Sequence, residues 1–337
     1  MIRVGICGAG AWGINHVRVT SSEAGCALVA VADPDPAARA RVTELVPSAR
    51  LVADADELLA DPTLDAVIIA SPAPTHIPLA RSALAAHKHV LVEKPLALSL
   101  HDARELFAAS EHTNRVAMVG HLMVHHPAVA RMRALLASGE LGSLHYVHAS
   151  RLHQGKLRQD ENVLWSFGPH DLSMLDVMLG RLPCSVSARG LSVLDEGVAD
   201  VVFLTLRYAS REMAHVHLSR VSPHKERRFS LVCAHQVAEL DDVATDKLRL
   251  YAKGYDAPPT FTEYAQYLAI RDGDVHIPRL TMEEPLRLQL RHFLACIRDG
   301  RRPLTDLASG LRITAVLDAA QRSLSLDGAP CDIANPL

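Results

Sequence analysis

The sequence predicts an α/β domain with a doubly wound parallel sheet, followed by an α+β domain with an open, mostly antiparallel sheet. Short β-branched segments alternate with helical segments over the first 120 residues, as in βαβ units with right-handed crossovers. After residue 120, segments with period-two alternation follow one another, which is typical of antiparallel strands. A chain of 337 residues is long enough for two such domains.

The elements of the first half are predicted from these alternating segments. Strands are expected at residues 3–7, 27–32, 66–70, 89–92 and 115–119. Helices are expected at residues 12–22, 37–45, 75–86 and 99–110. Ser99 and Asp102 form a capping pair for the last of these helices, and the run Val67-Ile68-Ile69 is apolar on both faces, as a central parallel strand should be.

The second half is predicted to begin with a helix at residues 127–138, close to Gly139 and Gly142. Strands are then expected at residues 144–152, 185–193, 201–208, 213–220, 228–233 and 237–241. Two helices, at residues 285–299 and 310–323, are expected to close the chain.

Composition excludes several classes of protein. Apolar residues make up 49% of the chain, charged residues 22%, and the net charge is −3, so neither a disordered protein nor a nucleic-acid binder is expected. The longest apolar run that we find is residues 26–32, too short to cross a membrane, and the first residues do not resemble a leader peptide. We therefore expect a cytoplasmic protein. Its six cysteines are scattered and are expected to be buried thiols.

A glycine-rich segment, Gly8-Ala9-Gly10-Ala11-Trp12-Gly13, follows the first predicted strand and opens a predicted helix. The first glycine of such a segment permits a tight turn, the second lets the backbone approach a pyrophosphate, and the third lets helix and strand pack closely. Asp33 stands at the end of the second strand, where a carboxylate accepts hydrogen bonds from a ribose 2′-hydroxyl and repels a 2′-phosphate. These residues predict a Rossmann domain that binds NAD rather than NADP.

Glu93-Lys94-Pro95 ends another predicted parallel strand, at the sheet edge where open α/β sheets bind ligands. Proline disfavours helix at the preceding residue, so Lys94 is expected to be extended at the strand tip.

In this order and spacing, these motifs resemble the Gfo/Idh/MocA family of NAD(P)-dependent sugar oxidoreductases. The resemblance also includes Ala70-Ser71-Pro72-Ala73-Pro74-Thr75-His76, Val119-Gly120-His121 and Arg312-Ile313, so it covers nearly the whole chain. It implies that the segment 70–76 lies under the nicotinamide and its ribose, and that Lys94 lies near the reacting hydroxyl. The implied cofactor contacts are Gly8, Gly10, Ala11, Trp12, Gly13, Asp33, Ser71, Pro72, Thr75, His76, Glu93 and Lys94.

The resemblance also implies a catalytic histidine in the second domain, here His170. The family usually has an aspartate four residues earlier, but this sequence has Ser166, so Asp171 or a main-chain group would have to orient the ring. Histidine as a residue type suits proton acceptance near neutral pH, whereas a charged lysine stabilises a developing alkoxide. We assign His170 as the proton acceptor and Lys94 as the electrostatic partner, with the reverse assignment as the alternative.

Residues 155–165 and 223–228 resemble the branch of the family that acts on nucleotide sugars, including UDP-N-acetylglucosamine 3-dehydrogenases. Cationic side chains suit the negative charges of a nucleotide diphosphate. The expected substrate contacts are His121, Lys156, Arg158, Asn162, Trp165, Lys225, Arg227 and Arg228. In the alternative interpretation, the cations of residues 225–228 pair with Glu226 and Asp241 on a solvated sheet edge.

The sequence therefore predicts oxidation of a secondary hydroxyl, at C3, of a nucleotide sugar in amino-sugar biosynthesis. The alternatives are an NAD(P)H-dependent 3-ketoreductase of a deoxysugar nucleotide, a dehydrogenase of a free sugar or polyol, an enzyme that uses NAD transiently, and a non-catalytic dinucleotide-binding protein. No metal is expected, because Pro127 starts the predicted helix after His121 and His125.

Residues 1–120 are assigned to NAD binding, and residues 121–337 to substrate binding and oligomerisation. In the predicted strand 201–208, Val202, Leu204 and Leu206 point to one face, and Val201 and Phe203 to the other. Because one helix layer cannot cover both sets, we expect a homodimer or homotetramer joined through this sheet.

Overall fold

The computed structural model describes residues 1–154, 161–256 and 269–337. The chain forms two compact units. The first contains Met1–His126, Glu283–Asp318 and Asn335–Leu337, and the second contains Pro127–Met282 and Ala319–Ala334. The division expected at residue 120 assigned all of 121–337 to the second domain, whereas the first unit also takes in residues 283–318.

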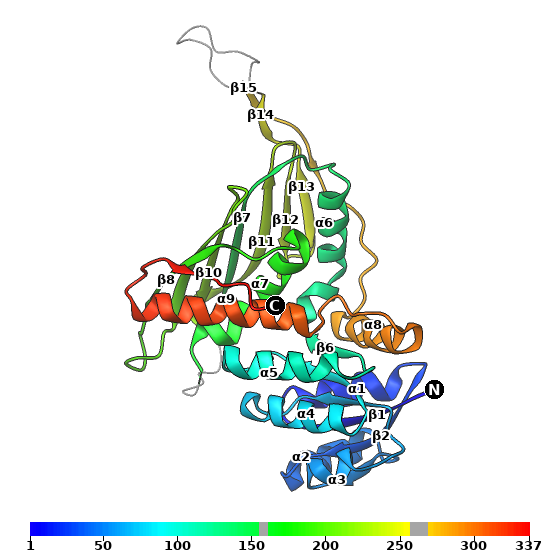
Figure 1. Ribbon diagram of the computed structural model, residues 1–337. Helices are drawn as coiled ribbons and strands as arrows, with labels where there is room; N and C mark the ends of the chain where they lie inside the picture. Colours follow the sequence, from blue (N-terminus) through cyan, green and yellow to red (C-terminus); the bar gives the residue numbers. More distant parts are fainter. Residues whose placement is uncertain (155–160, 257–268) are drawn as a thin grey trace. The chain divides into compact units, whose positions relative to one another are not determined.

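A parallel sheet with strand order β3-β2-β1-β4-β5-β6 forms the centre of the first unit (Figure 1). Its strands are β1 (Ile2–Cys7), β2 (Cys26–Ala32), β3 (Arg50–Val52), β4 (Ala66–Ile69), β5 (His89–Glu93) and β6 (Ala117–Gly120). Its helices are α1 (Gly13–Ser22), α2 (Pro36–Leu45), α3 (Ala55–Leu59), α4 (His76–Ala85), α5 (Leu100–Glu111) and α8 (Pro285–Asp299), with short 3₁₀ turns η1 (Ala73–Thr75) and η2 (Leu122–His125). The predicted doubly wound parallel sheet is confirmed. β3 and α3, of three and five residues, were not predicted because they are too short to show a period.

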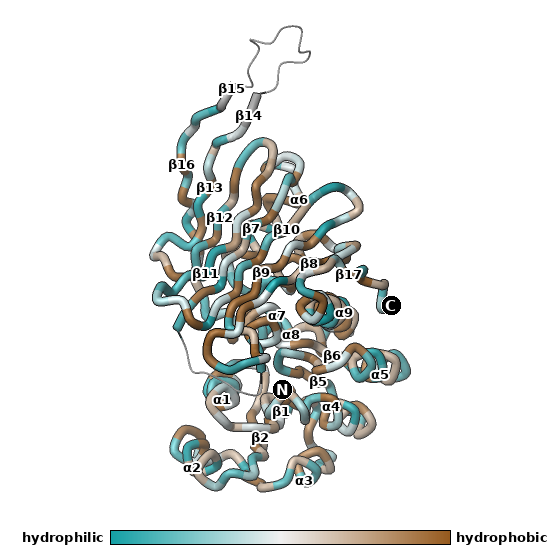
Figure 2. Tube along the Cα trace, turned by 90° about the vertical axis from the view of Figure 1, so that its left-hand side faces the viewer, coloured by the Kyte–Doolittle hydropathy of each residue, from teal (hydrophilic) through white to brown (hydrophobic). Residues whose placement is uncertain are grey.

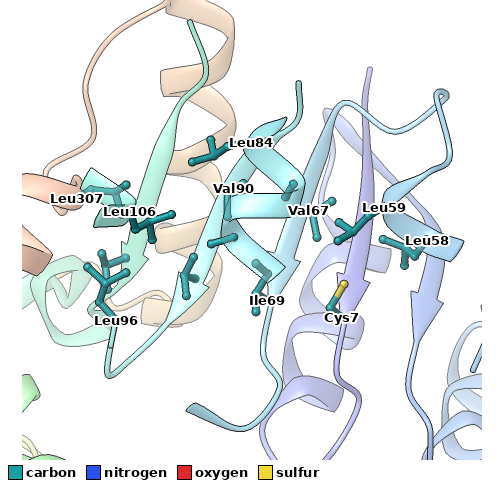
Figure 3. Close-up of a cluster of buried hydrophobic side chains, with 14 of the residues drawn as sticks. Cys7, Leu58, Leu59, Val67, Ile69, Leu84, Val90, Leu96, Leu106 and Leu307 are labelled. Carbon is teal, nitrogen blue, oxygen red and sulfur yellow. The ribbon is translucent and has the colours of Figure 1, made fainter. Parts of the chain in front are cut away.

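Both faces of this sheet carry an apolar core, as the strand β4 shows. Val67 and Ile69 belong to the cluster on one face, which Figure 3 shows together with Cys7, Leu58 and other side chains. Ile68 belongs to the cluster on the other face. All three β4 residues are 0% exposed, so β4 is a central strand covered on both sides, as predicted.

A mixed sheet with strand order β16-β13-β12-β11-β7-β10-β9-β8-β17 forms the described part of the second unit's main sheet (Figure 1). Its strands are β7 (Leu144–Gln154), β8 (Ser185–Leu191), β9 (Val201–Arg207), β10 (Met213–Ser219), β11 (Val221–Cys233), β12 (Val237–Asp241), β13 (Leu248–Tyr251), β16 (Val275–His276) and β17 (Cys331–Asp332). β7 and β10 pair in parallel, and the other neighbours pair antiparallel. β14 (Gly254–Asp256) and β15 (Ala269–Arg271) form a separate pair. The mostly antiparallel sheet was predicted, although β13 to β17 were not.

The helices α6 (Pro127–Ala137) and α7 (Val163–Leu179), and the end of α9 (Leu307–Ser325) from Ala319 onward, belong to this second unit. Along the strands of its sheet, brown and teal segments alternate in Figure 2. In β9, Val202, Leu204 and Leu206 are 0% exposed, whereas Phe203 is 44% exposed. The predicted assignment of these side chains to two faces is therefore confirmed.

The helix α7 was not predicted, although it carries His170. Pro169 lies inside it, and a proline removes one helical hydrogen bond and is a strong sequence signal against a helix. The helix begins at the N-cap Asn162, whose side chain accepts a hydrogen bond from the Trp165 N–H at 3.2 Å, and ends at Gly180 in the left-handed conformation. Caps at both ends and a largely buried surface therefore outweigh the cost of Pro169.

The six cysteines are unpaired thiols. Burial raises the pKa of Cys7 to about 12, with the charge of Asp56 adding to the shift. The expectation that the thiols are buried is wrong for Cys184, which is exposed. Among the described helices, none is long and apolar enough to cross a membrane.

Candidate active site

The predicted cofactor residues of the first unit lie at the carboxyl ends of its parallel strands. Gly8 follows β1, Asp33 follows β2, Ala70 and Ser71 follow β4, and Lys94 follows β5. Two backbone hydrogen bonds tie these ends together, from the Gly8 N–H to the Ala32 carbonyl and from the Ala70 N–H to the Cys7 carbonyl, both at 2.8 Å. The order of strands reverses between β1 and β4, which is where open α/β sheets bind their ligands.

Each of the three glycines in the segment 8–13 is required, or favoured over a residue with a side chain, for a different physical reason. Gly8 has a positive φ of 96°, and a Cβ there would lie 2.7 Å from the Ala70 backbone. A Cβ at Gly13 would lie 2.1 Å from the Gly8 carbonyl oxygen. A Cβ at Gly10 would meet nothing within 4 Å, so the packing of the described protein does not demand glycine there. The close approach of a ligand does demand it.

The N-terminus of α1 supports the same interpretation. Trp12 occupies its N-cap position, and no side chain caps the first turn with a hydrogen bond in the described structure. Free N–H groups at a helix N-terminus bind phosphate oxygens. The glycine loop and the start of α1 therefore fit the pyrophosphate of a dinucleotide.

Asp33 is buried and anchors the glycine loop. Its Oδ2 accepts a hydrogen bond from the Ala9 N–H at 2.7 Å, and its Oδ1 accepts one from the Asp35 N–H at 2.9 Å. Each carboxylate oxygen has further lone pairs, so the group can still accept a ribose hydroxyl. The same side chain that is expected to select NAD therefore also holds the pyrophosphate loop in place.

The loop after β4 is held by its own side chains. The Ser71 and Thr75 hydroxyls lie 2.6 Å apart, and Thr75 donates to the Pro72 carbonyl at 2.8 Å. His76 is 1% exposed, and its ring nitrogens lie 2.8 Å from the Pro95 carbonyl oxygen and 2.9 Å from the Ser71 carbonyl oxygen. His76 was predicted to contact the cofactor, and the structure shows that it joins this loop to the Lys94-Pro95 turn.

A buried carboxylate holds the other side of the Lys94 turn. Glu93 accepts hydrogen bonds from His16 Nε2 at 2.8 Å and from the Lys94 backbone N–H at 3.1 Å. Burial alone would raise the pKa of Glu93, but the hydrogen bonds from His16 and Trp12 and the charge of Lys94 lower it below its ordinary value. Glu93 is therefore an ionised anchor for Lys94, which is partly buried.

Two neighbouring positions make this anchor possible. A Cβ at Gly120 would lie 2.9 Å from Glu93 Oε1, so glycine there leaves room for the carboxylate. His16, 2% exposed, was missed by the sequence analysis. The signal was its position three residues after Gly13, which places both on the same face of α1. His121, expected to contact substrate, follows β6 and is 1% exposed.

In the second unit, His170 lies on α7 beside a buried ion pair. Arg151 of β7 donates to Asp171 through Nε at 2.8 Å and Nη2 at 3.0 Å, and these side chains are 7% and 1% exposed. Both oxygens of Asp171 are thus engaged by Arg151. The role of Asp171 or of a main-chain group in orienting His170 stays a prediction.

Two predicted substrate contacts in α7 have partners within their own unit. The Asn162 amide and the Trp165 indole both donate to Gln321 Oε1 of α9, at 2.9 and 3.2 Å. These bonds join the start of α7 to α9. The predicted contacts Lys156 and Arg158 lie outside the described residues.

The cations of β11 lie on opposite faces of the sheet. Arg227 pairs in register with Arg151 on the face that α7 covers, and its Nη1 lies 3.3 Å from Asp242. Arg228 points to the other face and pairs with Asp241 at 3.1 Å. Lys225 lies in the irregular stretch of β11 between Val221 and Glu226, and its positive charge acts on His153 of β7. The three predicted substrate cations therefore do not form one group, and we leave Arg228 out of the proposed site.

Comparisons with known proteins agree with this arrangement. Residues 2–121 match the model of the Gfo/Idh/MocA oxidoreductase family with its NAD-binding Rossmann fold, and residues 129–239 match the model of the Gfo/Idh/MocA C-terminal domain. The crystal structure of a protein from Magnetospirillum magnetotacticum is 32% identical, with a TM-score of 0.81, over 94% of this chain and 99% of that one.

Two curated relatives differ in their substrates. The chain is 27% identical to a UDP-N-acetylglucosamine 3-dehydrogenase of Acidithiobacillus ferrooxidans, over 93% of this chain and 94% of that protein. The structure of that enzyme matches with a TM-score of 0.83 at 25% identity, over 97% of this chain and 98% of that one. The chain is 31% identical to an inositol 2-dehydrogenase of Acidothermus cellulolyticus, but over only 65% of this chain and 66% of that protein. With both of its units matched by the family's models, the chain belongs to the Gfo/Idh/MocA family of NAD-binding oxidoreductases.

Proposed function

We propose that this protein oxidises a secondary hydroxyl, at C3, of a nucleotide sugar to a ketone, with NAD as the oxidant. One observation supports dehydrogenase chemistry more than any other: Lys94 stands at a strand end, and buried histidines hold the residues on both sides of it. His16 is hydrogen-bonded to the Glu93 carboxylate, and His76 is hydrogen-bonded to the Pro95 carbonyl. Such anchoring fixes a cationic side chain at the sheet edge expected to face the cofactor.

The two proposed catalytic residues divide the chemistry between them. When bound, NAD would accept hydride from the carbinol carbon. His170 accepts the hydroxyl proton, and the Lys94 ammonium donates a hydrogen bond to the same oxygen and stabilises its developing negative charge. The products are a keto sugar, NADH and one proton.

Relatives and charge together support the nucleotide sugar. The UDP-N-acetylglucosamine enzyme matches along nearly the whole of both chains, including the second unit. Arg227 lies on the sheet face that α7 covers, and the charge of Lys225 acts on His153 of the same face. Such cations suit a diphosphate, whereas a neutral polyol does not require them. A ketone made at C3 would suit an aminotransferase as the next enzyme. The relation to inositol 2-dehydrogenases supports a free polyol as the second candidate.

The test is NADH formation, followed by its near-ultraviolet absorbance, with NAD and either UDP-N-acetylglucosamine, free N-acetylglucosamine or myo-inositol. We expect turnover with the nucleotide sugar alone. Turnover with myo-inositol alone would support the second candidate, and equal use of the free and nucleotide sugars would contradict the proposal.

Variants then test the two roles. His170→Asn and Lys94→Met should each lower kcat by ~10²–10⁴-fold and change NADH affinity little, because neither side chain is expected to bind the adenosine or the phosphates. If His170→Asn retains wild-type turnover, the roles are reversed and Lys94 is the base.

A further inference from the structure

Side chains from three elements of the second unit surround His153, on the sheet face that α7 covers. We call them the His153 cluster: His153 of β7, Phe167 of α7, and Lys225 and Arg227 of β11. The ring of His153 stacks on Phe167 with centroids 4.7 Å apart and an interplanar angle of 17°. On β11, Arg227 has the same orientation as the buried Phe229, and it pairs in register with Arg151 of β7.

The cluster is held rigidly by two contacts between β7 and α7. His153 and Arg151 are two residues apart on β7 and so point to the same side. Their partners Phe167 and Asp171 are four residues apart on α7 and so lie on one helical face. The ion pair of Arg151 with Asp171 engages both carboxylate oxygens of Asp171. The further cations beside His153 are Lys225 and Arg227, and Arg227 is paired through Nη1 with Asp242.

Two buried polar atoms of the cluster lack hydrogen-bond partners among the described residues, Arg227 Nε and His153 Nδ1. Arg227 contacts Asp242 through a different atom, Nη1, at 3.3 Å. Burial lowers the pKa of His153, and the positive charges of Arg227, Lys225 and Arg151 lower it further. The space beside His153 therefore has a positive potential and buried groups that need a partner.

We propose that the His153 cluster is an anion subsite that binds a phosphate of the substrate's diphosphate. Arg227 donates through its free Nε–H, Lys225 supplies a second charge, and His153 contributes its unengaged ring nitrogen on the rigid support of Phe167. This inference rests on the proposed function. The catalytic residue His170 follows Phe167 by three residues, about one helical turn, so α7 spans a phosphate at one turn and a reacting sugar hydroxyl at the next.

Binding of inorganic pyrophosphate, measured by titration calorimetry, tests the subsite without catalysis. The protein is first saturated with NADH, so that the glycine loop is occupied. The sequence offers a matched pair of variants, because Arg227 and its neighbour Arg228 point to opposite faces. We expect Arg227→Gln to weaken pyrophosphate binding ~10–100-fold, as expected for loss of a charge-assisted hydrogen bond, and Arg228→Gln to change it less than about twofold.

A second variant shows whether a loss of binding in Arg227→Gln comes from misfolding. Lys225 is exposed, so Lys225→Gln should leave the thermal midpoint unchanged and still weaken pyrophosphate binding several-fold. Equal losses in the Arg227 and Arg228 variants would overturn the proposal, because they would show an unspecific charge effect. Wild-type protein that binds no pyrophosphate would also overturn it, since the buried atoms would then be satisfied by water alone.

Turnover of UDP-N-acetylglucosamine separates this inference from the proposed function. We expect kcat/KM for that substrate to fall ~10–100-fold in Arg227→Gln with unchanged NADH affinity. Pyrophosphate binding that depends on Arg227, without wild-type turnover of the nucleotide sugar, would keep the subsite and contradict the proposed substrate. Equal turnover of the nucleotide sugar by wild type and Arg227→Gln would keep the proposed substrate and contradict the subsite.

Discussion

At the scale of single residues, Asp33 both anchors the glycine loop and faces the expected ribose site. Asp33→Ala removes the acceptor of the Ala9 N–H and the charge that repels a 2′-phosphate. We expect NADH binding to weaken ~10–100-fold and the ratio of NADPH to NADH affinity to rise, both measured by fluorescence titration. Asp35→Ala is the control, because Asp35 only caps α2. Tighter binding of NADPH than NADH by the wild type would contradict the role of Asp33.

The pair formed by His16 and Glu93 gives a second prediction. His16→Ala leaves an ionised, buried carboxylate short of its closest partner, so the free energy of unfolding should fall by ~1–3 kcal/mol. Adding Glu93→Gln removes the charge and should restore part of this loss, a non-additive result typical of residues in contact. Urea unfolding of the two single variants and the double variant measures the coupling.

If the pair also positions Lys94, kcat should fall in His16→Ala more than NADH affinity does. His101→Ala is the matched control, since His101 is 79% exposed in its pair with Glu105. If the effects of the His16 and Glu93 changes on stability simply add, the buried pair has no coupling energy. If the His16 and His101 changes lower kcat equally, the pair does not position Lys94.

Local sequence could predict those site residues whose roles depend on neighbours in the chain. Gly8, Asp33 and Lys94 follow predicted strands, so their position at the sheet edge could be deduced. His16 and Asp171 depend on partners far along the chain, Glu93 and Arg151 respectively. A single sequence does not show which of several carboxylates or cations will meet after folding.

At the scale of elements, a buried ion pair joins the ends of neighbouring strands in the second unit. Arg220, after β10, donates to Asp200, before β9, at 2.6 Å, and the two side chains are 5% and 0% exposed. Asp200 also accepts the backbone N–H groups of Val193 and Leu194 beyond β8. One carboxylate thus fixes the connections of three strands.

Removing that carboxylate should destabilise the protein strongly. Asp200→Asn leaves Arg220 buried without its charged partner, and we expect a loss of ~3–5 kcal/mol in the free energy of unfolding. Asp327→Asn breaks the exposed pair with Arg189, whose side chains are 95% and 71% exposed, and should cost at most ~1 kcal/mol. Similar denaturant midpoints for the two variants would contradict this ranking.

The difference in the free energy of unfolding between wild type and Asp200→Asn should depend on pH. Burial alone would raise the pKa of Asp200, but the N–H groups of Val193 and Leu194 and the Arg220 side chain lower it below its ordinary value. A carboxyl whose pKa is lower in the folded state stabilises the protein above its unfolded pKa of about 4 and loses this effect as pH falls through the folded pKa. Thermal unfolding from pH 7 to pH 3 should therefore show the two proteins converging in acid.

Most elements were predictable because their burial pattern is local. The period-two pattern of β9 and the doubly apolar run of β4 identify strands before any tertiary contact is known. The helix α7 was missed because Pro169 is a local signal against helix, while the evidence for it is tertiary: the Arg151–Asp171 pair, the His153–Phe167 stack and the link to Gln321. The helix that carries the proposed base thus depends on packing more than on propensity.

At the scale of the whole molecule, one face of the second unit's sheet exposes apolar side chains on neighbouring strands. Tyr146 of β7, Phe203 of β9 and Met213 of β10 are 47%, 44% and 45% exposed, and the register places Met213 beside Tyr146 and His217 beside Phe203. Exposed apolar groups on adjoining strands are typical of an interface. We therefore keep the proposal of a homodimer or homotetramer formed through this face.

Light scattering at micromolar concentration tests this proposal. Phe203→Glu places a charge in the middle of the apolar face and should produce monomers, because a two-fold axis would bring the new charges of both copies into one interface. Leu45→Glu is the control, since Leu45 is similarly exposed, at 44%, on α2 of the first unit. Monomeric wild-type protein, or dissociation in both variants, would contradict the proposed interface.

The same face should make assembly sensitive to acid. His217 stacks on Phe203 at 4.3 Å, and His215 lies 6.0 Å from His148. Burial lowers the pKa values of His215 and His217, and the neighbouring histidines lower them further, although Glu226 opposes the shift at His217. The pKa values of both rings therefore lie below their ordinary value of about 6.5, so both are mostly neutral at pH 7 and become charged as the pH falls.

Protonation on two facing copies would then create like charges in the interface, so the oligomer should weaken as pH falls from 7 to 5. Sedimentation velocity should show that the oligomer dissociates at a higher protein concentration at pH 5 than at pH 7. Replacing His215 and His217 together by asparagine should remove most of this pH dependence, because the neutral amides keep polarity without titrating. Equal acid sensitivity in the double variant would place the responsible charge elsewhere on the chain.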